Sequence, residues 1–190
     1  ELHLIVETTG KVFVGDYIGR FEPGHLVLTG PRLPHNWISS ELPAEGVRVR
    51  DLVLQFSDEP LRQASEHLSE LREALPLLER AKHGIEFMGL SEQAYESIVK
   101  IRQSSGLQRF SEFVALLSLL ARHHDYRLLS NVQLQSFEDD ASLRQISEVV
   151  DYITANYSNQ FALIDIAKRV SMSESRFSRY FRRATGNTFT

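Results

Sequence analysis

The first third of the chain alternates apolar and polar residues over short runs, which are separated by turn-forming residues. The four runs are LHLIV at 2–6, KVFVGDYIGRF at 11–21, PGHLVLTGP at 23–31 and VRVRDLVLQF at 47–56. A period of two residues is typical of half-buried strands, and the Pro23-Gly24 pair is typical of a tight turn. The residues of the last run that we expect to face the core are Val47, Val49, Leu52, Leu54 and Phe56. The pattern predicts an all-β region that ends near Ser57, with an irregularity at Asp51 where the alternation slips.

From residue 58 onward the spacing of apolar residues becomes that of helices. One side of successive turns carries Leu68, Leu71, Leu75 and Leu78. Pro76 predicts a break between two helices there, and Ser91 is expected to cap a third helix. The helix expected at 107–124 is apolar on nearly all sides, which predicts a place at the centre of its domain or an interface with a second subunit. Residues 126–141 have weak periodicity and an acidic cluster, and we interpret them as a linker.

The last part of the chain, from Ser142, contains three amphipathic stretches with helical periodicity. The first of them carries Leu143, Ile146, Val149, Val150 and Ile153 and is expected to end near Asn156. A short helix follows over 163–170, and residues 171–174 form a turn before the final helix. A short helix, a tight turn and a second helix match the helix-turn-helix, in which the second helix enters the major groove of DNA.

The final helix separates aromatic from basic side chains. At about 100° per residue its buried face consists of Phe177, Tyr180, Phe181 and Ala184. The opposite side, with its flanks, consists of Ser175, Arg176, Ser178, Arg179, Arg182 and Arg183. A basic helix face is also typical of an ordinary solvated surface, so this pattern alone leaves both interpretations open. The serines before the helix have a structural interpretation too, because Ser173 is a favoured N-cap and Ser171 and Glu174 have capping-box spacing.

The charge of the chain is unevenly distributed. The 190 residues have a formal net charge of -4 and no cysteine, which excludes disulfides, thiolate metal sites and cysteine nucleophiles. Residues 143–190, however, contain seven basic and four acidic side chains. A basic end on an acidic body predicts two tasks in one chain. No apolar run approaches the roughly 20 residues that cross a bilayer, and the start lacks signal-peptide features, so we expect no membrane association and a cytoplasmic location.

The run DYITANYSNQFALIDIAKRVSMSESRFSRYFRRATGNTF at 151–189 closely resembles the first helix-turn-helix of the AraC/XylS family of bacterial transcription regulators. The resemblance implies that Ser175, Ser178 and Arg179 read base edges of double-stranded DNA. It implies phosphate contacts for Arg176, Arg182 and Arg183. Arginine pairs bidentately with guanine whereas serine reads weakly, so Arg179 is the strongest candidate for a base reader. Family members carry two such units, and this chain reaches only the first before Thr190, which predicts a fragment.

GDYIGRFEPGHLVLTGPRLPHNW at 15–37 resembles the cupin-type β-barrel at the front of many regulators of this family. The resemblance implies that the Pro-Gly turn and the Pro-His pair lie on adjacent short strands. It implies a small-molecule effector in the barrel, with His25, His35 and Trp37 as candidate effector-binding residues. Trp37 is expected either to line the barrel mouth or to fill the core. Sugar-like effectors are common in the family, but nothing in these residues selects one.

A metal-dependent cupin enzyme is the alternative function from another class. Its metal would need three or four converging ligands, and this region offers only His3, His25 and His35 without the expected carboxylate spacing. Isolated histidines are more often hydrogen-bonded structural groups, and the His123-His124 pair at a helix end complements the helix dipole. The sequence has no GxGxxG, P-loop or GxSxG motif. We therefore expect no catalytic residues, no metal and no cofactor.

These patterns predict an α+β chain with an N-terminal cupin-like β-barrel, a helical dimerisation region and an all-α helix-turn-helix end. The expected boundaries are 1–125 for the effector-sensing and dimerisation domain, 126–141 for the linker and 142–190 for the first half of a DNA-binding domain. The expected function is a homodimeric, sequence-specific transcription regulator whose binding to DNA is controlled by an effector. A module for dimerisation alone, built on the helix at 107–124, is compatible with this expectation.

Overall fold

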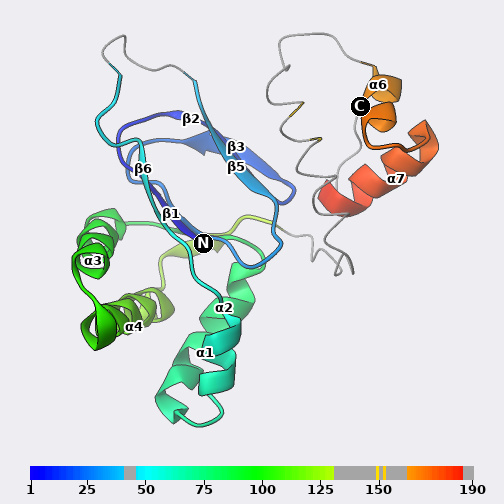
Figure 1. Ribbon diagram of the computed structural model, residues 1–190. Coiled ribbons are helices and arrows are strands. Elements are labelled where there is room, and N and C mark those ends of the chain that lie inside the picture. Colours follow the sequence, from blue (N-terminus) through cyan, green and yellow to red (C-terminus); the bar gives the residue numbers. More distant parts are fainter. Residues whose placement is uncertain (41–45, 131–148, 150–151, 153–161, 186–190) are drawn as a thin grey trace. The chain divides into compact units, whose positions relative to one another are not determined.

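The computed structural model describes residues 1–40, 46–130, 149, 152 and 162–185, without the side chains at 180 and 183–185 (Figure 1). The chain divides into two compact units, Glu1–Asn131 and Val132–Thr190. The first unit combines antiparallel sheets with helices, and the described part of the second is helical. The predicted α+β class is confirmed.

A five-stranded antiparallel sheet with the order β6-β1-β4-β7-β8 forms the centre of the first unit. Its strands are β1 (Leu2–Ile5), β4 (Leu26–Leu28), β6 (Asp51–Leu54), β7 (Ile85–Phe87) and β8 (Tyr126–Leu128). Leu2 lies opposite Leu28 on one neighbouring strand and Leu54 on the other. This register places one row of leucines on a single face of the sheet, where they belong to the main hydrophobic core.

A three-stranded antiparallel sheet has the order β3-β2-β5. Its strands are β2 (Gly10–Val14), β3 (Tyr17–Phe21) and β5 (His35–Ser39). Gly15 has a φ of 59°, which allows the tight turn between β2 and β3. In the part of the chain that the structure describes, no strand pairing joins the two sheets into a closed barrel. The Pro-Gly turn connects β3 to β4 and the Pro-His pair opens β5, and neither β3 nor β4 pairs with β5 over the described residues, so the expected placement on adjacent strands is wrong.

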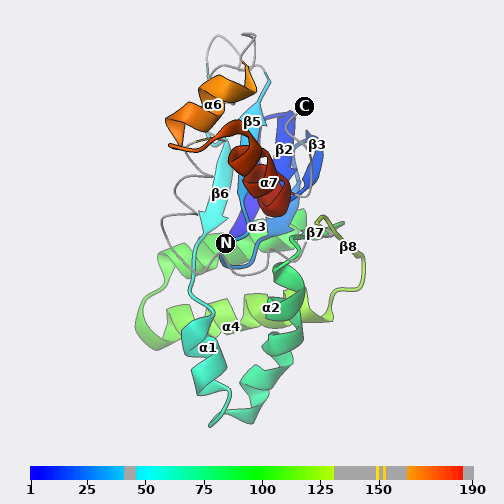
Figure 2. The same ribbon diagram turned by 90° about the vertical axis from the view of Figure 1, so that its right-hand side faces the viewer.

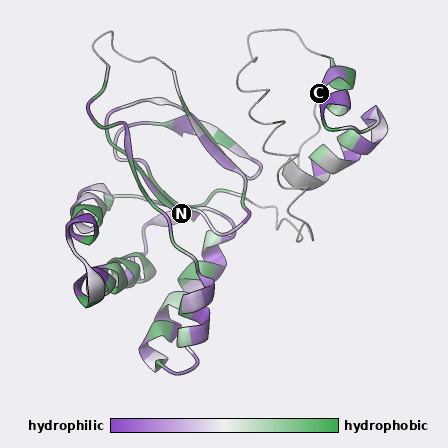
Figure 3. Cartoon of the chain, in the orientation of Figure 1, coloured by the Kyte–Doolittle hydropathy of each residue, from purple (hydrophilic) through white to green (hydrophobic). Residues whose placement is uncertain are grey.

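The first unit also has helices, which lie mainly below β6 in Figure 2, and side chains of its α-helices share the main hydrophobic core with the leucine row. They are α1 (Glu59–Ala64), the 3₁₀ helix η1 (Ser69–Ala74), α2 (Leu75–Ala81), α3 (Ser91–Gln103) and α4 (Gly106–Arg122). Pro76 lies in the first turn of α2, so the break expected there is confirmed. Hydrophobic residues extend along most of α4 (Figure 3), and Leu116, Leu117 and Leu120 are its buried residues.

Several expected boundaries in the first unit are wrong. The end of the all-β region near Ser57 is confirmed, since β6 ends at Leu54 and α1 begins at Glu59, but the later strands β7 and β8, which return to the sheet after α2 and α4, were not predicted. The strand β8 therefore occupies the start of the predicted linker, and residues 131–141 of that linker lie outside the described residues. Strand β6 begins at Asp51, so Val47 and Val49 precede it. Ser91 is the first residue of α3 rather than its cap, because Leu90 occupies the N-cap position.

The described part of the second unit consists of α6 (Leu163–Arg169), α7 (Glu174–Thr185) and two residues of the segment before them. Their buried residues form one hydrophobic cluster of Val149, Ile166, Ala167, Val170 and Phe177. The helix predicted over 143–156 lies outside the described residues apart from Val149 and Tyr152. Over the described residues of both units, we find no helix with the length and apolar character needed to span a membrane.

Candidate functional site

The turn between α6 and α7 has the geometry of a Schellman motif. The amide of Ser171 donates to the carbonyl of Lys168 at 3.0 Å, and the amide of Met172 donates to the carbonyl of Ala167 at 2.9 Å. Ser171 has a φ of 55°, in the left-handed region that ends helices. These bonds satisfy the last carbonyls of α6 and fix the direction in which the chain leaves it. The turn between the two helices is therefore defined by its own backbone.

Ser173 caps α7. Its hydroxyl accepts a hydrogen bond from the amide of Arg176 at 3.4 Å, and its carbonyl accepts one from the amide of Phe177 at 2.8 Å. This confirms the structural interpretation of Ser173. The capping box expected between Ser171 and Glu174 is wrong, because α7 begins at Glu174 and Ser171 instead ends α6. Glu174 still lies in the first turn, where the helix dipole favours an acid.

The helix α7 has an aromatic buried side and a basic exposed side. Phe177 is fully buried and its ring centroid lies 5.7 Å from that of Phe181, which packs against the same cluster. Outward-facing positions are Ser175, Arg176, Arg179 and Arg182, which are exposed, and Ser178, which is half-buried. The side chain of Arg183 lies outside the described residues. Among the side chains that are described, no carboxylate pairs with Arg176, Arg179 or Arg182.

The first unit brings three histidines around its tryptophan. The ring of His3 stacks on Trp37 with centroids 3.9 Å apart and an interplanar angle of 20°. The indole Nε1 of Trp37 donates to Nδ1 of His25 at 3.3 Å, and His35 meets the indole edge-on at 5.6 Å. Trp37 is only 5% exposed, so of the two expected places for this side chain the core is confirmed. We call His3, His25, His35 and Trp37 the histidine cluster.

Carboxylates surround the histidine cluster. Glu1 Oε1 lies 3.2 Å from His3 Nδ1 and 3.4 Å from His35 Nε2, and Asp51 Oδ2 lies 3.0 Å from His3 Nε2. Burial lowers the pKa of His25, although Glu86, whose Oε1 lies 3.6 Å from its Nε2, acts in the opposite direction. Because the indole N–H points at Nδ1 of His25, the neutral tautomer has its proton on Nε2 and the histidine accepts from Trp37.

The nitrogens of the histidine cluster are used in hydrogen bonds and ion pairs rather than converging on one point. Nδ1 of His35, for example, lies 2.6 Å from the carbonyl oxygen of Leu33. Within residues 1–40, 46–130 and the described part of the second unit, no three side chains of histidine, aspartate or glutamate are placed to hold a metal ion. The residues present therefore do not fit the metal site that the alternative enzyme would require. His123 lies at the end of α4, and its Nε2 lies 2.8 Å from the carbonyl oxygen of Met88.

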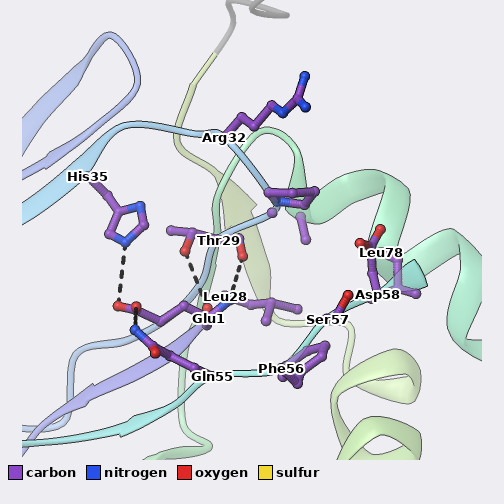
Figure 4. Close-up of a pocket in the computed structure, with 13 residues that line it drawn as sticks. Glu1, Leu28, Thr29, Arg32, His35, Gln55, Phe56, Ser57, Asp58 and Leu78 are labelled. Carbon is purple, nitrogen blue, oxygen red and sulfur yellow. Dashed lines mark hydrogen bonds and ion pairs between the residues drawn. The ribbon is translucent and has the colours of Figure 1, made fainter. Parts of the chain in front are cut away.

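A cleft of about 520 Å³ lies beside the histidine cluster (Figure 4). Its polar wall contains Glu1, Thr29, His35 and Gln55, and its apolar wall contains Leu28, Phe56, Leu78 and Ala81. Of the predicted effector-binding residues only His35 lines it, whereas His25 and Trp37 do not. The sequence pattern did not identify Glu1, Gln55 or Asp58 as site residues. Glu1 immediately precedes β1, Gln55 immediately follows β6 and Asp58 immediately precedes α1, so all three flank regular elements, where periodicity gives no signal.

Comparisons of the chain with models of protein families, with curated proteins and with solved structures found no match.

Proposed function

We propose that the chain is part of a sequence-specific DNA-binding transcription regulator, with α7 as the helix that enters the major groove. The observation that supports this most strongly is the basic exposed side of α7, which has no carboxylate partners among the described residues. Unpaired arginines on a helix are available for phosphates and base edges. The resemblance to AraC/XylS regulators over 151–189 supports the same assignment.

The turn before α7 supports the proposal independently of charge. A helix that reads DNA must be held at a fixed angle to its support, and the Schellman motif at Ser171 together with the buried Phe177 provides that rigidity. Within α7, Arg179 is our base reader, with Ser175 and Ser178 as weaker readers. Arg176, Arg182 and Arg183 are the phosphate contacts that set the register.

The first unit supports control by dimerisation and by an effector. The N-terminal turns of α4 carry Leu107, which is 87% exposed, and Phe110, which is 46% exposed. We assign this apolar end to the contact with a second copy, since a dimer fixes the spacing of two half-sites on DNA. We further propose that the two sheets are arranged as in a cupin. An effector bound in this unit would then bias how the DNA-binding units are held.

A selection from a random pool of DNA duplexes tests this function. We expect the chain to enrich one sequence motif and to bind the enriched duplex at least about tenfold more tightly than a scrambled duplex. A double variant, Arg176→Ala with Arg182→Ala, should weaken binding to both duplexes and reduce the salt dependence of binding. The matched control replaces the exposed Arg20 and Arg48 of the first unit by alanine and should leave binding unchanged. A pool that shows no enrichment would contradict the proposal.

A further inference from the structure

The cleft beside the histidine cluster has two chemically different walls. The apolar wall comes from β4, from the segment after β6 and from α2, and its Leu28 and Leu78 are at most 3% exposed in the folded chain. The polar wall comes from the residues just before β1, just after β4, at the start of β5 and just after β6. A volume of about 520 Å³ lies in the range of small-molecule sites, and such sites pair apolar surface with a few placed polar groups. A ligand that fits both walls has an apolar body and one polar head.

The charged side chains along the cleft indicate whether the polar head of such a ligand is cationic or anionic. Arg32 is the only arginine or lysine among the lining residues, and Figure 4 shows its side chain extending away from the cavity. Asp58 pairs with Arg62, with 2.8 Å between Oδ2 and Nε, and Arg62 pairs with Glu79 as well. The carboxylate of Glu1 has no arginine or lysine partner among the described residues: it contacts the imidazoles of His3 and His35 and the amide of Gln55, while the α-ammonium of the same residue donates to the carbonyl of Thr29 at 2.9 Å. The polar wall thus presents a carboxylate that no arginine or lysine neutralises.

Glu1 is held ionised in this position. Burial acts to raise its pKa, but the hydrogen bonds from Gln55 and His3 and the charges of His35 and His3 outweigh burial, so the pKa lies below its ordinary value. Gln55 Nε2 donates to Glu1 Oε2 at 2.9 Å, which orients the carboxylate at the cleft (Figure 4). A partly buried carboxylate that no arginine or lysine neutralises attracts a cationic group and repels an anionic one.

We propose that this cleft binds a small organic cation, a primary amine or a guanidinium on an apolar body, with the charged head at Glu1 and the body against Leu78 and Ala81. The proposal rests on the proposed function in one respect, since it names the chemical class of the effector. The same geometry connects the site to Trp37. Glu1 Oε1 is shared by His35 in the cleft wall and by His3, and His3 stacks on the indole. A cation that pairs with the carboxylate of Glu1 therefore changes the environment of the Trp37 indole through His3.

Three probes with the same ring test the class of ligand. Cyclohexylmethylamine, cyclohexylmethanol and cyclohexanecarboxylate carry a positive, neutral and negative head on one apolar body. They are titrated into the 190-residue chain at constant ionic strength, with the fluorescence of Trp37 and calorimetry as readouts, because Trp37 is the only tryptophan. We expect the amine to bind about tenfold more tightly than the alcohol, and the carboxylate to bind more weakly than the alcohol.

Two variants at the cleft and one control variant separate an effect of charge on binding from an effect on folding. Glu1→Gln should abolish the preference for the amine over the alcohol, whereas Glu96→Gln, at an exposed carboxylate of α3, should leave that preference unchanged. Ser57→Arg places a permanent cation at an exposed position of the cleft, so it should weaken the amine and strengthen the carboxylate without disturbing the core. Equal or tighter binding of the carboxylate, no binding of any probe at roughly millimolar concentration, or an amine preference that survives Glu1→Gln would overturn the proposal. The selection of DNA duplexes is carried out without these probes. Failure of the DNA-binding proposal and failure of the ligand proposal are therefore recognised separately.

Discussion

Replacement of Phe177 by alanine is the sharpest stability test of the helical unit that carries α7. Phe177 is fully buried and lies at the centre of the cluster that joins α7 to α6. Its neighbours in this cluster are small or medium-sized, with Val149, Ile166, Ala167 and Val170 as the buried members. Neighbours of this size cannot fill the space of a lost phenyl ring, so we expect Phe177→Ala to leave a cavity.

The size of the effect follows from the burial. A buried phenylalanine removes about 150 Å² of apolar surface from water, which corresponds to about 4 kcal/mol at 25 cal/mol per Å². Measured losses for buried Phe→Ala changes are about 3–5 kcal/mol, which agrees with this figure. A unit of roughly 60 residues has a free energy of unfolding of about 3–9 kcal/mol. Phe177→Ala should therefore unfold much or all of this unit, whereas Phe177→Leu should cost less than about 1.5 kcal/mol.

Urea unfolding with two signals measures this effect. Trp37 lies in the first unit and its fluorescence follows that unit alone, whereas far-ultraviolet circular dichroism follows the helices of both units. The fluorescence curve gives the unfolding transition of the first unit. Any further transition in the circular dichroism curve is assigned to unfolding of the second unit. We expect this further transition to be lost in Phe177→Ala and retained in Phe177→Leu. A loss of less than about 1 kcal/mol in Phe177→Ala would refute the inference that this side chain holds α7 on α6.

Further predictions concern the first unit. Burial lowers the pKa of His25 from its ordinary 6.5, so the unfolded chain binds a proton more readily than the folded one. The free energy of unfolding should be fully retained above about pH 6.5 and should fall as the pH drops below it, and His25→Gln should flatten this dependence in urea titrations at about pH 7.5 and 5.5. Gly84→Ala should be more destabilising in thermal melts than Gly89→Ala: both glycines have a φ near 70°, but only at Gly84 would the new Cβ collide with Val14. We expect about 1–2 kcal/mol for Gly89→Ala and at least about 1 kcal/mol more for Gly84→Ala, and equal losses would contradict the role of this contact.

The elements that the sequence predicted well are those with a strong period. The leucine rows of β1 and β4, the helix α4 and the buried Phe177 of α7 follow from alternation or from helical spacing. The strands β7 and β8 were missed because each has only three residues, too few for a period to be visible between helices. The N-cap Ser173 was predicted correctly, but a capping box was also expected at Ser171, because the two serines are equally good caps by residue type. Only the backbone conformation at Ser171 distinguishes them.

The candidate site in the first unit was predicted in part. His25, His35 and Trp37 do come together, yet Trp37 is stacked on His3 and buried, so it is part of the core instead of a cleft wall. The cleft is lined by Glu1 and His35 but not by His25 or Trp37. Its position depends on how α2 packs against the end of the large sheet, a long-range contact that neither alternation nor motif spacing encodes.

Binding of DNA by an Arg179→Ala variant tests the central proposal most directly. Dissociation constants are measured at one salt concentration on the enriched duplex and on a scrambled duplex, with Arg20→Ala as a control at an exposed arginine of the first unit. We expect Arg179→Ala to weaken binding by about 1–3 kcal/mol, roughly 5- to 150-fold, on the enriched duplex and little on the scrambled one. An equal loss on both duplexes would reduce Arg179 to a phosphate contact, and no loss on either would contradict the assignment of α7 as the helix that reads DNA.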